Sequence, residues 1–219
     1  MNQSRIYLDH AATTPVDPVV REAMQPFLAE TFGNPSSIHR AGQAARRAID
    51  GARDALATAL SCEASEVTFT SGGTEADNLA VLGVLLAARE RERDHVVVAA
   101  AEHHAVLDAA QAAARLFGFR TTVLTVDVEG KVDPASVAEV VDDRTALVSI
   151  MHANNEIGSF NPVRAIADVA HARGALFHTD AVQSFGAVPV SFDSTGADLI
   201  SVSAHKIYGP KGVGVLALR

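Results

Sequence analysis

Short stretches typical of β-strands alternate with longer stretches typical of helices along this chain of 219 residues. The strand candidates lie near 67–70, 96–100, 121–125, 145–150, 175–179, 197–202 and 213–218. Strands that are separated by helices favour parallel pairing, and parallel sheets are covered by helices on both faces. We therefore expect an α/β fold in which a mostly parallel seven-stranded sheet lies between two helical layers. A chain of this length can bury the core of one large domain.

Proline directly after a capping residue predicts where several helices begin. An Asp or Asn side chain can accept a hydrogen bond from a free N–H of the first turn, where proline is tolerated. Three such pairs are Asp17-Pro18, Asp133-Pro134 and Asn161-Pro162. The alanine-rich run 41–60 has apolar residues at helical spacing and predicts a long amphipathic helix.

Lys206 directly follows the strand pattern 197–202, within the sequence Ser203-Ala204-His205-Lys206. A lysine amine held at a strand end can form a Schiff base with an aldehyde cofactor, and neighbouring hydroxyl and imidazole groups can bind a phosphate. Most lysines are solvated surface charges, so this position alone is a moderate signal.

Two further segments fit the same kind of cofactor. The strand pattern 175–179 ends at Asp180, and a carboxylate there can keep a pyridine nitrogen protonated, although a helix cap is the alternative role. The sequence Ser71-Gly72-Gly73-Thr74-Glu75 stands between a strand pattern and a helix that we expect to start near Thr74. A glycine turn followed by a helix N-terminus suits a phosphate, although such a turn can also be purely structural.

Seven sequence blocks extend this pattern over nearly the whole chain. They occupy residues 7–15, 33–37, 70–78, 102–103, 152–158, 178–184 and 203–212. In this order they resemble the fold-type I enzymes that use pyridoxal phosphate, and within these the cysteine desulfurases of the NifS/IscS kind. The resemblance implies the large domain of that fold, with pyridoxal 5'-phosphate as the cofactor.

The resemblance also implies a role for each matched residue on the ring side of the cofactor. Lys206 would bond to the cofactor aldehyde and move the proton at the substrate α-carbon. His103 would stack on the pyridine ring, and Asp180 would pair with the ring nitrogen. Gln183 would donate to the phenolic oxygen, and Asn155 would lie near that oxygen and the substrate carboxylate. A flat ring, a carboxylate and amides suit these tasks.

On the phosphate side, the resemblance assigns the anion to hydroxyl, imidazole and backbone donors. The residues are Gly73, Thr74, Ser203 and His205. The implied reaction converts L-cysteine to L-alanine and passes the sulfur to a cysteine persulfide. The implied partners are a second copy in a homodimer and a sulfur acceptor such as an iron–sulfur scaffold protein.

The cysteine that the family uses as nucleophile has no counterpart in the sequence. In the family it follows the lysine, in a part of the chain that is absent here together with the C-terminal small domain. The single cysteine, Cys62, lies outside all seven blocks, and nearby Glu63 and Glu66 would raise its pKa. We therefore interpret residues 1–219 as the cofactor-binding large domain with its N-terminal segment, inactive alone, and Cys62 as structural.

Three other functions remain open at this stage. The chain could be a noncatalytic or split-gene module that binds the cofactor, or part of a selenocysteine lyase or another class V aminotransferase-like enzyme. A purely structural α/β domain is less favoured, because the motifs of Lys206, Asp180, Gln183, His103 and Thr74 occur together.

Composition limits the remaining possibilities. The net charge of −8 and the dispersed basic residues argue against nonspecific nucleic-acid binding. Hydrophobic residues make up 48%, but no stretch is long and charge-free enough to span a bilayer, and the N-terminus lacks a signal-peptide pattern. One cysteine fits a reducing compartment. Of the nine histidines, the adjacent pair His103 and His104 point in different directions and the widely spaced ones accompany no second cysteine, so we expect no metal site. We expect a cytoplasmic protein whose apolar excess serves contacts with a second subunit and with the missing domain.

Overall fold

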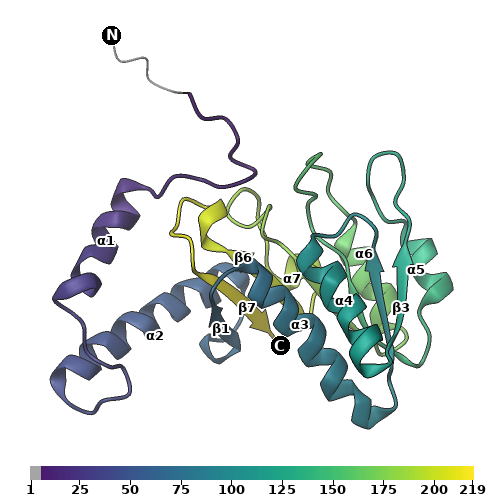
Figure 1. The fold of residues 1–219 in the computed structure, drawn as a ribbon, viewed down its shortest axis with the longest axis horizontal. Coiled ribbons are helices and arrows are strands. Elements are labelled where there is room, and N and C mark those ends of the chain that lie inside the picture. The colour runs from purple at the N-terminus through teal and green to yellow at the C-terminus, as the bar shows by residue number, and fades with distance from the viewer. Residues whose placement is uncertain (1–5) are drawn as a thin grey trace.

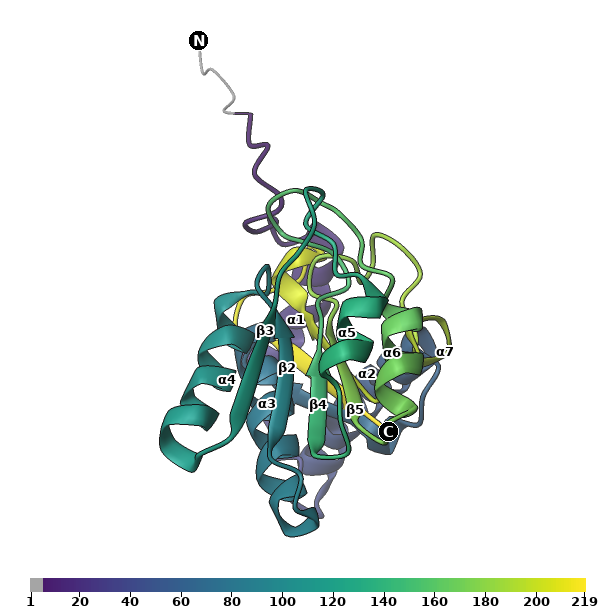
Figure 2. The same ribbon diagram turned by 90° about the vertical axis from the view of Figure 1, so that its right-hand side faces the viewer.

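A computed structural model describes residues 6–219, and in it these residues form a seven-stranded sheet with helices on both faces (Figures 1 and 2). The strands are β1 Val67–Thr70, β2 His95–Ala99, β3 Arg120–Leu124, β4 Thr145–Ser149, β5 Leu176–Asp180, β6 Leu199–Ser203 and β7 Gly214–Leu218. Each strand lies within two residues of its predicted position, so the expected α/β architecture is confirmed.

The strand order in the sheet is β1-β7-β6-β5-β4-β2-β3. Strands β2 to β6 pair in parallel, whereas β7 runs antiparallel to both of its neighbours, β1 and β6. The carboxyl ends of β2, β4, β5 and β6 therefore meet at one edge of the sheet. In open α/β sheets this is the edge where ligands bind.

Each face of the sheet has its own core. On one face lie α3 (Gly73–Ala88) and α4 (His104–Phe117), and on the other lie α2 (Arg40–Leu60), α5 (Pro134–Val140) and α6 (Val163–His171). Along β2, Val96 and Val98 pack in the first core, and Val97 and Ala99 in the second. Successive strand residues point to opposite faces, which explains why this strand is apolar throughout.

Two of the three predicted proline-containing helix starts are confirmed. The side chain of Asp17 accepts a hydrogen bond from the N–H of Val19 at the start of α1 (Pro18–Ala29). Asp133 caps α5 in the same way, by accepting from Ala135. The long helix predicted at 41–60 is α2, and the helix expected near Thr74 begins one residue earlier, at Gly73.

The prediction that Asn161 caps a helix is wrong. Helix α6 begins at Val163 with Pro162 as its N-cap, and no side chain caps this helix within residues 6–219. Asn161 is buried, where its Oδ1 accepts from the N–H of Val132 at 2.9 Å and its Nδ2 donates to the carbonyl of Met151 at 2.8 Å. The buried backbone groups of two distant loops would otherwise lack partners, and this need outweighs the local cap.

The remaining short elements are α7 (Phe192–Thr195) and the 3₁₀ turns Ala64–Glu66, Arg89–Arg91 and Ala204–Lys206. Helix α1 and the adjoining end of α2 extend away from the sheet (Figure 1), and α1 has no buried residue. Across the described part of the chain, no helix combines the length and apolar character needed to cross a membrane.

Candidate active site

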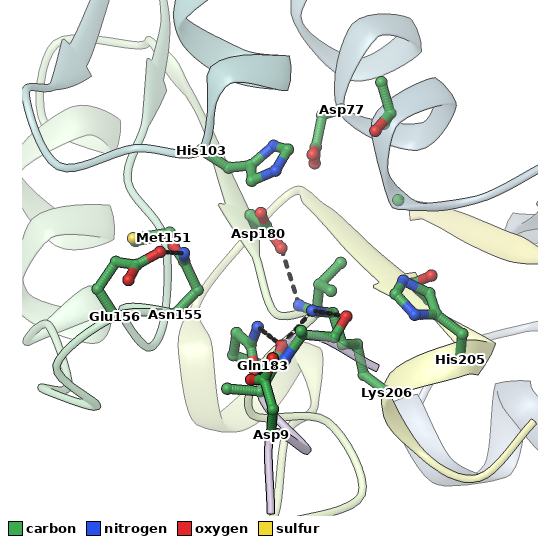
Figure 3. Close-up of a pocket in the computed structure, with 16 residues that line it drawn as sticks. Asp9, Asp77, His103, Met151, Asn155, Glu156, Asp180, Gln183, His205 and Lys206 are labelled. Atoms are coloured by element: carbon green, nitrogen blue, oxygen red, sulfur yellow. Dashed lines mark hydrogen bonds between the residues drawn. The ribbon is translucent and has the colours of Figure 1, made fainter. Parts of the chain in front are cut away.

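A cavity of about 560 Å³ lies at the edge of the sheet where the parallel strands end (Figure 3). All nine residues that the sequence singled out line it: Gly73, Thr74, His103, Asn155, Asp180, Gln183, Ser203, His205 and Lys206. These residues come from segments that are up to 133 positions apart in the chain, from Gly73 to Lys206. The fold therefore brings the predicted residues into one site.

The strand ends explain how this gathering occurs. Asp180 is the last residue of β5, and Ser203 is the last residue of β6, its parallel neighbour. Lys206 ends the 3₁₀ turn that follows β6, so its side chain starts from the same sheet edge. Gly73 and Thr74 form the first turn of α3, which packs against β6 and β7.

The first turn of α3 and the end of β6 form an anion cradle. The early N–H groups of a helix have no intrahelical partner and favour an anion. A Cβ atom added at Gly73 would lie 2.8 Å from Cγ2 of Val182, so only glycine allows the backbone to approach this closely. The hydroxyl of Ser203 is buried and finds no hydrogen-bond partner among residues 6–219. A phosphate accepting from these donors would satisfy that hydroxyl, and the donor set therefore fits the phosphate of pyridoxal phosphate.

Asp180 is a buried acid at the end of β5 that lines the cavity. Its Oδ1 accepts a hydrogen bond from the N–H of Val182 at 2.8 Å. Burial raises the pKa of Asp180, and smaller effects of the Val182 hydrogen bond, of the nearby His103 ring and of the Lys206 amine oppose this. Figure 3 shows Asp180 between the His103 ring and Lys206.

His103 is fixed at the N-terminus of α4. Its Nδ1 accepts a hydrogen bond from the N–H of Ala105 at 3.1 Å, so a neutral ring carries its proton on Nε2. The cap holds the flat ring over the cavity. His205, on the phosphate side, bonds through Nδ1 to the hydroxyl of Thr13 at 3.1 Å.

The N-terminal segment closes one side of the cavity, which reasoning from single residues had not predicted. The amine of Lys206 donates to the carbonyls of Ala11 and of Ala12, the latter at 2.9 Å. The amide of Gln183 also donates to Ala11, at 2.9 Å. Burial lowers the pKa of Lys206, while the charges of Asp180 and Asp9 raise it. The sequence signal for this contact was the block at 7–15, to which no role had been given.

The sequence reasoning also missed lining residues that carry no motif role. They are Asp9, Ala11, Ala12, Asp77, Met151, Glu156 and Val182. Asp77 is 1% exposed on a helix whose buried face is otherwise apolar. The sequence signal for Asp77 was its place in the block at 70–78. Asn155 lies at the cavity as expected, but its amide donates to Glu156 at 2.8 Å.

Cys62 does not line this cavity. It borders a separate hollow with Glu63, Glu66 and Arg219. Burial raises the pKa of Cys62, Glu66 and Glu63 raise it further, and Arg219 opposes them. A thiol with a raised pKa is a poor nucleophile at neutral pH. Within residues 6–219, no group of three or more His, Cys, Asp or Glu side chains is placed to hold a metal.

A parallel α/β sheet that gathers an amine, a buried carboxylate and an anion cradle at its strand ends defines the class of fold-type I enzymes that depend on pyridoxal phosphate. Residues 6–219 match the aminotransferase class-V family. The chain belongs to this family, and its cysteine desulfurase relatives use pyridoxal phosphate.

Individual relatives are cysteine desulfurases. The chain is 50% identical to the cysteine desulfurase IscS of Dictyoglomus turgidum over 98% of its own length and 54% of that protein. It is 47% identical to the IscS of Anaeromyxobacter sp., covering 98% of this chain and 53% of the relative. The solved structure of SspA in complex with cysteine matches with a TM-score of 0.94 and 38% identity, over 98% of this chain and 61% of SspA. The chain thus spans about half the length of the curated relatives it matches.

Proposed function

We propose that this chain is the cofactor-binding large domain of a cysteine desulfurase that uses pyridoxal phosphate. The substrate is L-cysteine, the product is L-alanine, and the sulfur passes to a cysteine as a persulfide. The observation that carries the proposal is the gathering of Lys206, Asp180 and His103 around one cavity beside an anion cradle. The similarity to cysteine desulfurases, and to a protein solved in complex with cysteine, supports L-cysteine as the substrate and removal of its sulfur as the reaction.

When bound, pyridoxal phosphate draws electrons from the α-carbon of an attached amino acid. Lys206 is the residue we assign to the covalent bond with the cofactor. Its partial burial lowers its pKa and increases the share of neutral amine that can accept a proton. The carbonyls of Ala11 and Ala12 receive its N–H groups, so the amine has a defined position when it is not bonded to the cofactor.

The other residues hold the cofactor in place. We assign Asp180 to the ring nitrogen, His103 to the ring face and Gln183 to the phenolic oxygen, with Asn155 near that oxygen. The phosphate is assigned to the first turn of α3 and to the side chains of Thr74, Ser203 and His205. A carboxylate opposite a protonated ring nitrogen stabilises the positive ring, and fixed donors need no rearrangement during the reaction.

The sulfur nucleophile is proposed to come from outside residues 1–219. Cys62 lies away from the cavity, and its raised pKa disfavours the thiolate. A C-terminal small domain carrying the cysteine, or a separately encoded partner, would supply it, so this chain alone is expected to be inactive. The exposed apolar side chains of Ile6, Leu8, Phe32 and Ile38 suit a further protein surface, and we propose a homodimer with a scaffold-type sulfur acceptor in the cytoplasm.

The test is purification with pyridoxal phosphate, followed by a visible absorption spectrum. The parent chain should retain the cofactor and absorb in the visible range, and Lys206→Ala should lose this band. Lys131→Ala is the matched control, because Lys131 is a surface lysine paired with Glu129. A band that persists in Lys206→Ala would disprove the lysine assignment. Alanine release from L-cysteine, measured with and without a C-terminal partner, separates a desulfurase from a noncatalytic binding module.

A further inference from the structure

Three acidic side chains lie buried at or near the cavity, and the proposed function uses one of them, Asp180. Asp180 is 6% exposed, Asp77 1% and Glu102 6%. They come from β5, from α3 and from the turn that follows β2. Figure 3 shows Asp77 reaching from α3 toward Asp180. Three ionised carboxylates in such a small buried region would repel one another strongly.

Asp77 and Glu102 each have one buried carboxyl oxygen that no hydrogen bond from residues 6–219 satisfies. Oδ1 of Asp77 and Oε2 of Glu102 find no hydrogen-bond partner within the described residues. Nε2 of His178 lies 3.7 Å from Oδ1 of Asp77, but His178 is fully buried and burial lowers its pKa to about 3. That imidazole is therefore neutral and offers Asp77 no positive charge. An ionised carboxylate with a bare buried oxygen and no cation is strongly disfavoured.

Asp180 is better placed to carry a charge. It accepts the N–H of Val182, and the positive charge of Lys206 favours its ionised form. For Asp77, burial and the charge of Asp180 both raise the pKa well above its usual range, against a weaker hydrogen bond from Ser201. Burial does the same to the pKa of Glu102, against the N–H of Met151, which donates at 2.7 Å.

Ser149, His178 and Ser201 form a series of buried hydrogen bonds beside Asp77. The hydroxyl of Ser149 lies 2.8 Å from Nδ1 of His178, and Nε2 of His178 lies 2.9 Å from the hydroxyl of Ser201. With the ring proton on Nε2, His178 donates to the Ser201 hydroxyl, whose own proton is then free to donate to Asp77. These hydrogen bonds bring no positive charge to Asp77, because His178 is neutral.

We propose that Asp77 and Glu102 stay protonated, so that this group of three buried acids carries a single negative charge and Asp180 holds it. This inference rests on the proposed function, because that charge is the one that would face the ring nitrogen. The charged or titratable groups around the two neutral acids are His178 and Asp180 from β5, His103 from α4 and Lys206 from the turn after β6. In a low-dielectric site, a single charge on Asp180 can act on the ring nitrogen without repulsion from a second ionised carboxylate.

Infrared spectroscopy of the cofactor-free full chain at neutral pH tests the protonation directly. Difference spectra between the parent and Asp77→Asn, and between the parent and Glu102→Gln, should each show the loss of one carboxylic-acid carbonyl band. Loss of ionised carboxylate bands instead would overturn the inference. Carbon-13 NMR of the parent, labelled at the Asp and Glu carboxyl carbons, needs no variant. It should show two carbons that remain at the protonated shift, and their full ionisation at neutral pH would overturn the inference even if both variants misfold.

Cofactor titration adds a second readout. Asp77→Asn should change the dissociation constant of pyridoxal phosphate by less than about twofold, because a neutral amide replaces a neutral acid. Asp180→Asn should weaken binding by about tenfold or more, since it removes a charge-assisted bond. Equal losses in the two variants would contradict the single charge on Asp180. If the parent chain binds no pyridoxal phosphate, the proposed function fails, and the infrared result still decides whether Asp77 and Glu102 are neutral.

Discussion

Asp180 and Ser201 are directly paired across the parallel strands β5 and β6. Because of this register, Asp180 ends its strand beside a strand that continues two residues further, to Ser203, before the turn to Lys206. The acid and the amine of the site thus belong to neighbouring strands at the same sheet edge. Four measurements examine whether the surrounding residues act as the geometry indicates.

Ser203→Ala should weaken pyridoxal phosphate binding without destabilising the cofactor-free chain. The buried hydroxyl of Ser203 lacks a partner among the described residues, so its removal costs the free protein no hydrogen bond. A bond to a phosphate contributes about 1.5–3 kcal/mol, or at least about tenfold in affinity. Absorbance titration and thermal unfolding measure the two effects. Ser149→Ala, which removes a hydrogen bond to His178, should instead lower stability and leave affinity largely unchanged.

Gly73→Ala should disrupt the anion cradle. The new Cβ would lie 2.8 Å from Cγ2 of Val182, so the first turn of α3 or the Val182 side chain beside it must shift, which disturbs the phosphate position. We expect cofactor affinity to fall by about tenfold or more, which corresponds to about 1.4 kcal/mol. Gly83→Ala is the control on the same helix, where the nearest atom is 4.0 Å away. It should stabilise the chain by about 0.5–1 kcal/mol, and unchanged affinity in Gly73→Ala would disprove the cradle.

His178 should make the cofactor-free chain less stable in acid. Burial lowers the pKa of His178 from 6.5 to about 3, so between these values the unfolded state binds a proton that the folded state does not. The contribution of neutral His178 to the free energy of unfolding is therefore fully present above pH 6.5. It is lost as the pH falls toward 3, by about 1.4 kcal/mol per pH unit. Urea unfolding at a series of pH values measures the slope. In His178→Gln the slope of the unfolding free energy against pH should correspond to one proton fewer. An unchanged slope would show that His178 does not cause the loss of stability in acid.

Asn161→Ala should destabilise the chain by about 2–4 kcal/mol. Both ends of this buried amide are bonded, to the N–H of Val132 and the carbonyl of Met151, and the variant leaves both groups unpaired. Chemical denaturation measures the loss. Asn155→Ala removes a more exposed amide that bonds to Glu156, and it should cost at most about 0.5 kcal/mol. Similar values for the two variants would show that Asn161 does not join these loops.

Much of the fold could be predicted because its signals are local. Alternation of apolar strands with helices identified seven strands, and the caps at Asp17 and Asp133 depend on groups two residues away. Asn161 carries the same local signal, but its side chain bonds to loops 29 and 10 residues away. No local pattern reports such long-range competition for a polar group. The order of the strands and the antiparallel direction of β7 were also outside what the pattern could indicate.

The candidate site shows the same division. The sequence motifs selected nine residues that all line the cavity. They could do so because the motifs place reactive side chains near strand ends or helix starts, where ligands bind. They did not show that Asp77 faces Asp180, because an acid on a helix reveals its partners only after the helix has packed. Nor did they show that the backbone of Ala11 and Ala12 receives the Lys206 amine.

The sequence by itself determined the chemistry and the layers of this protein: the amine, the acid, the imidazole, the glycine turn and the seven strands between helices. Tertiary structure alone decided which buried groups lack a hydrogen-bond partner among residues 6–219, such as Oδ1 of Asp77 and the hydroxyl of Ser203. Burial and the positions of neighbouring charges set the protonation of a carboxyl group, and both depend on elements far apart in the chain. For that reason the choice of Asp180 as the charged acid belongs to the folded structure.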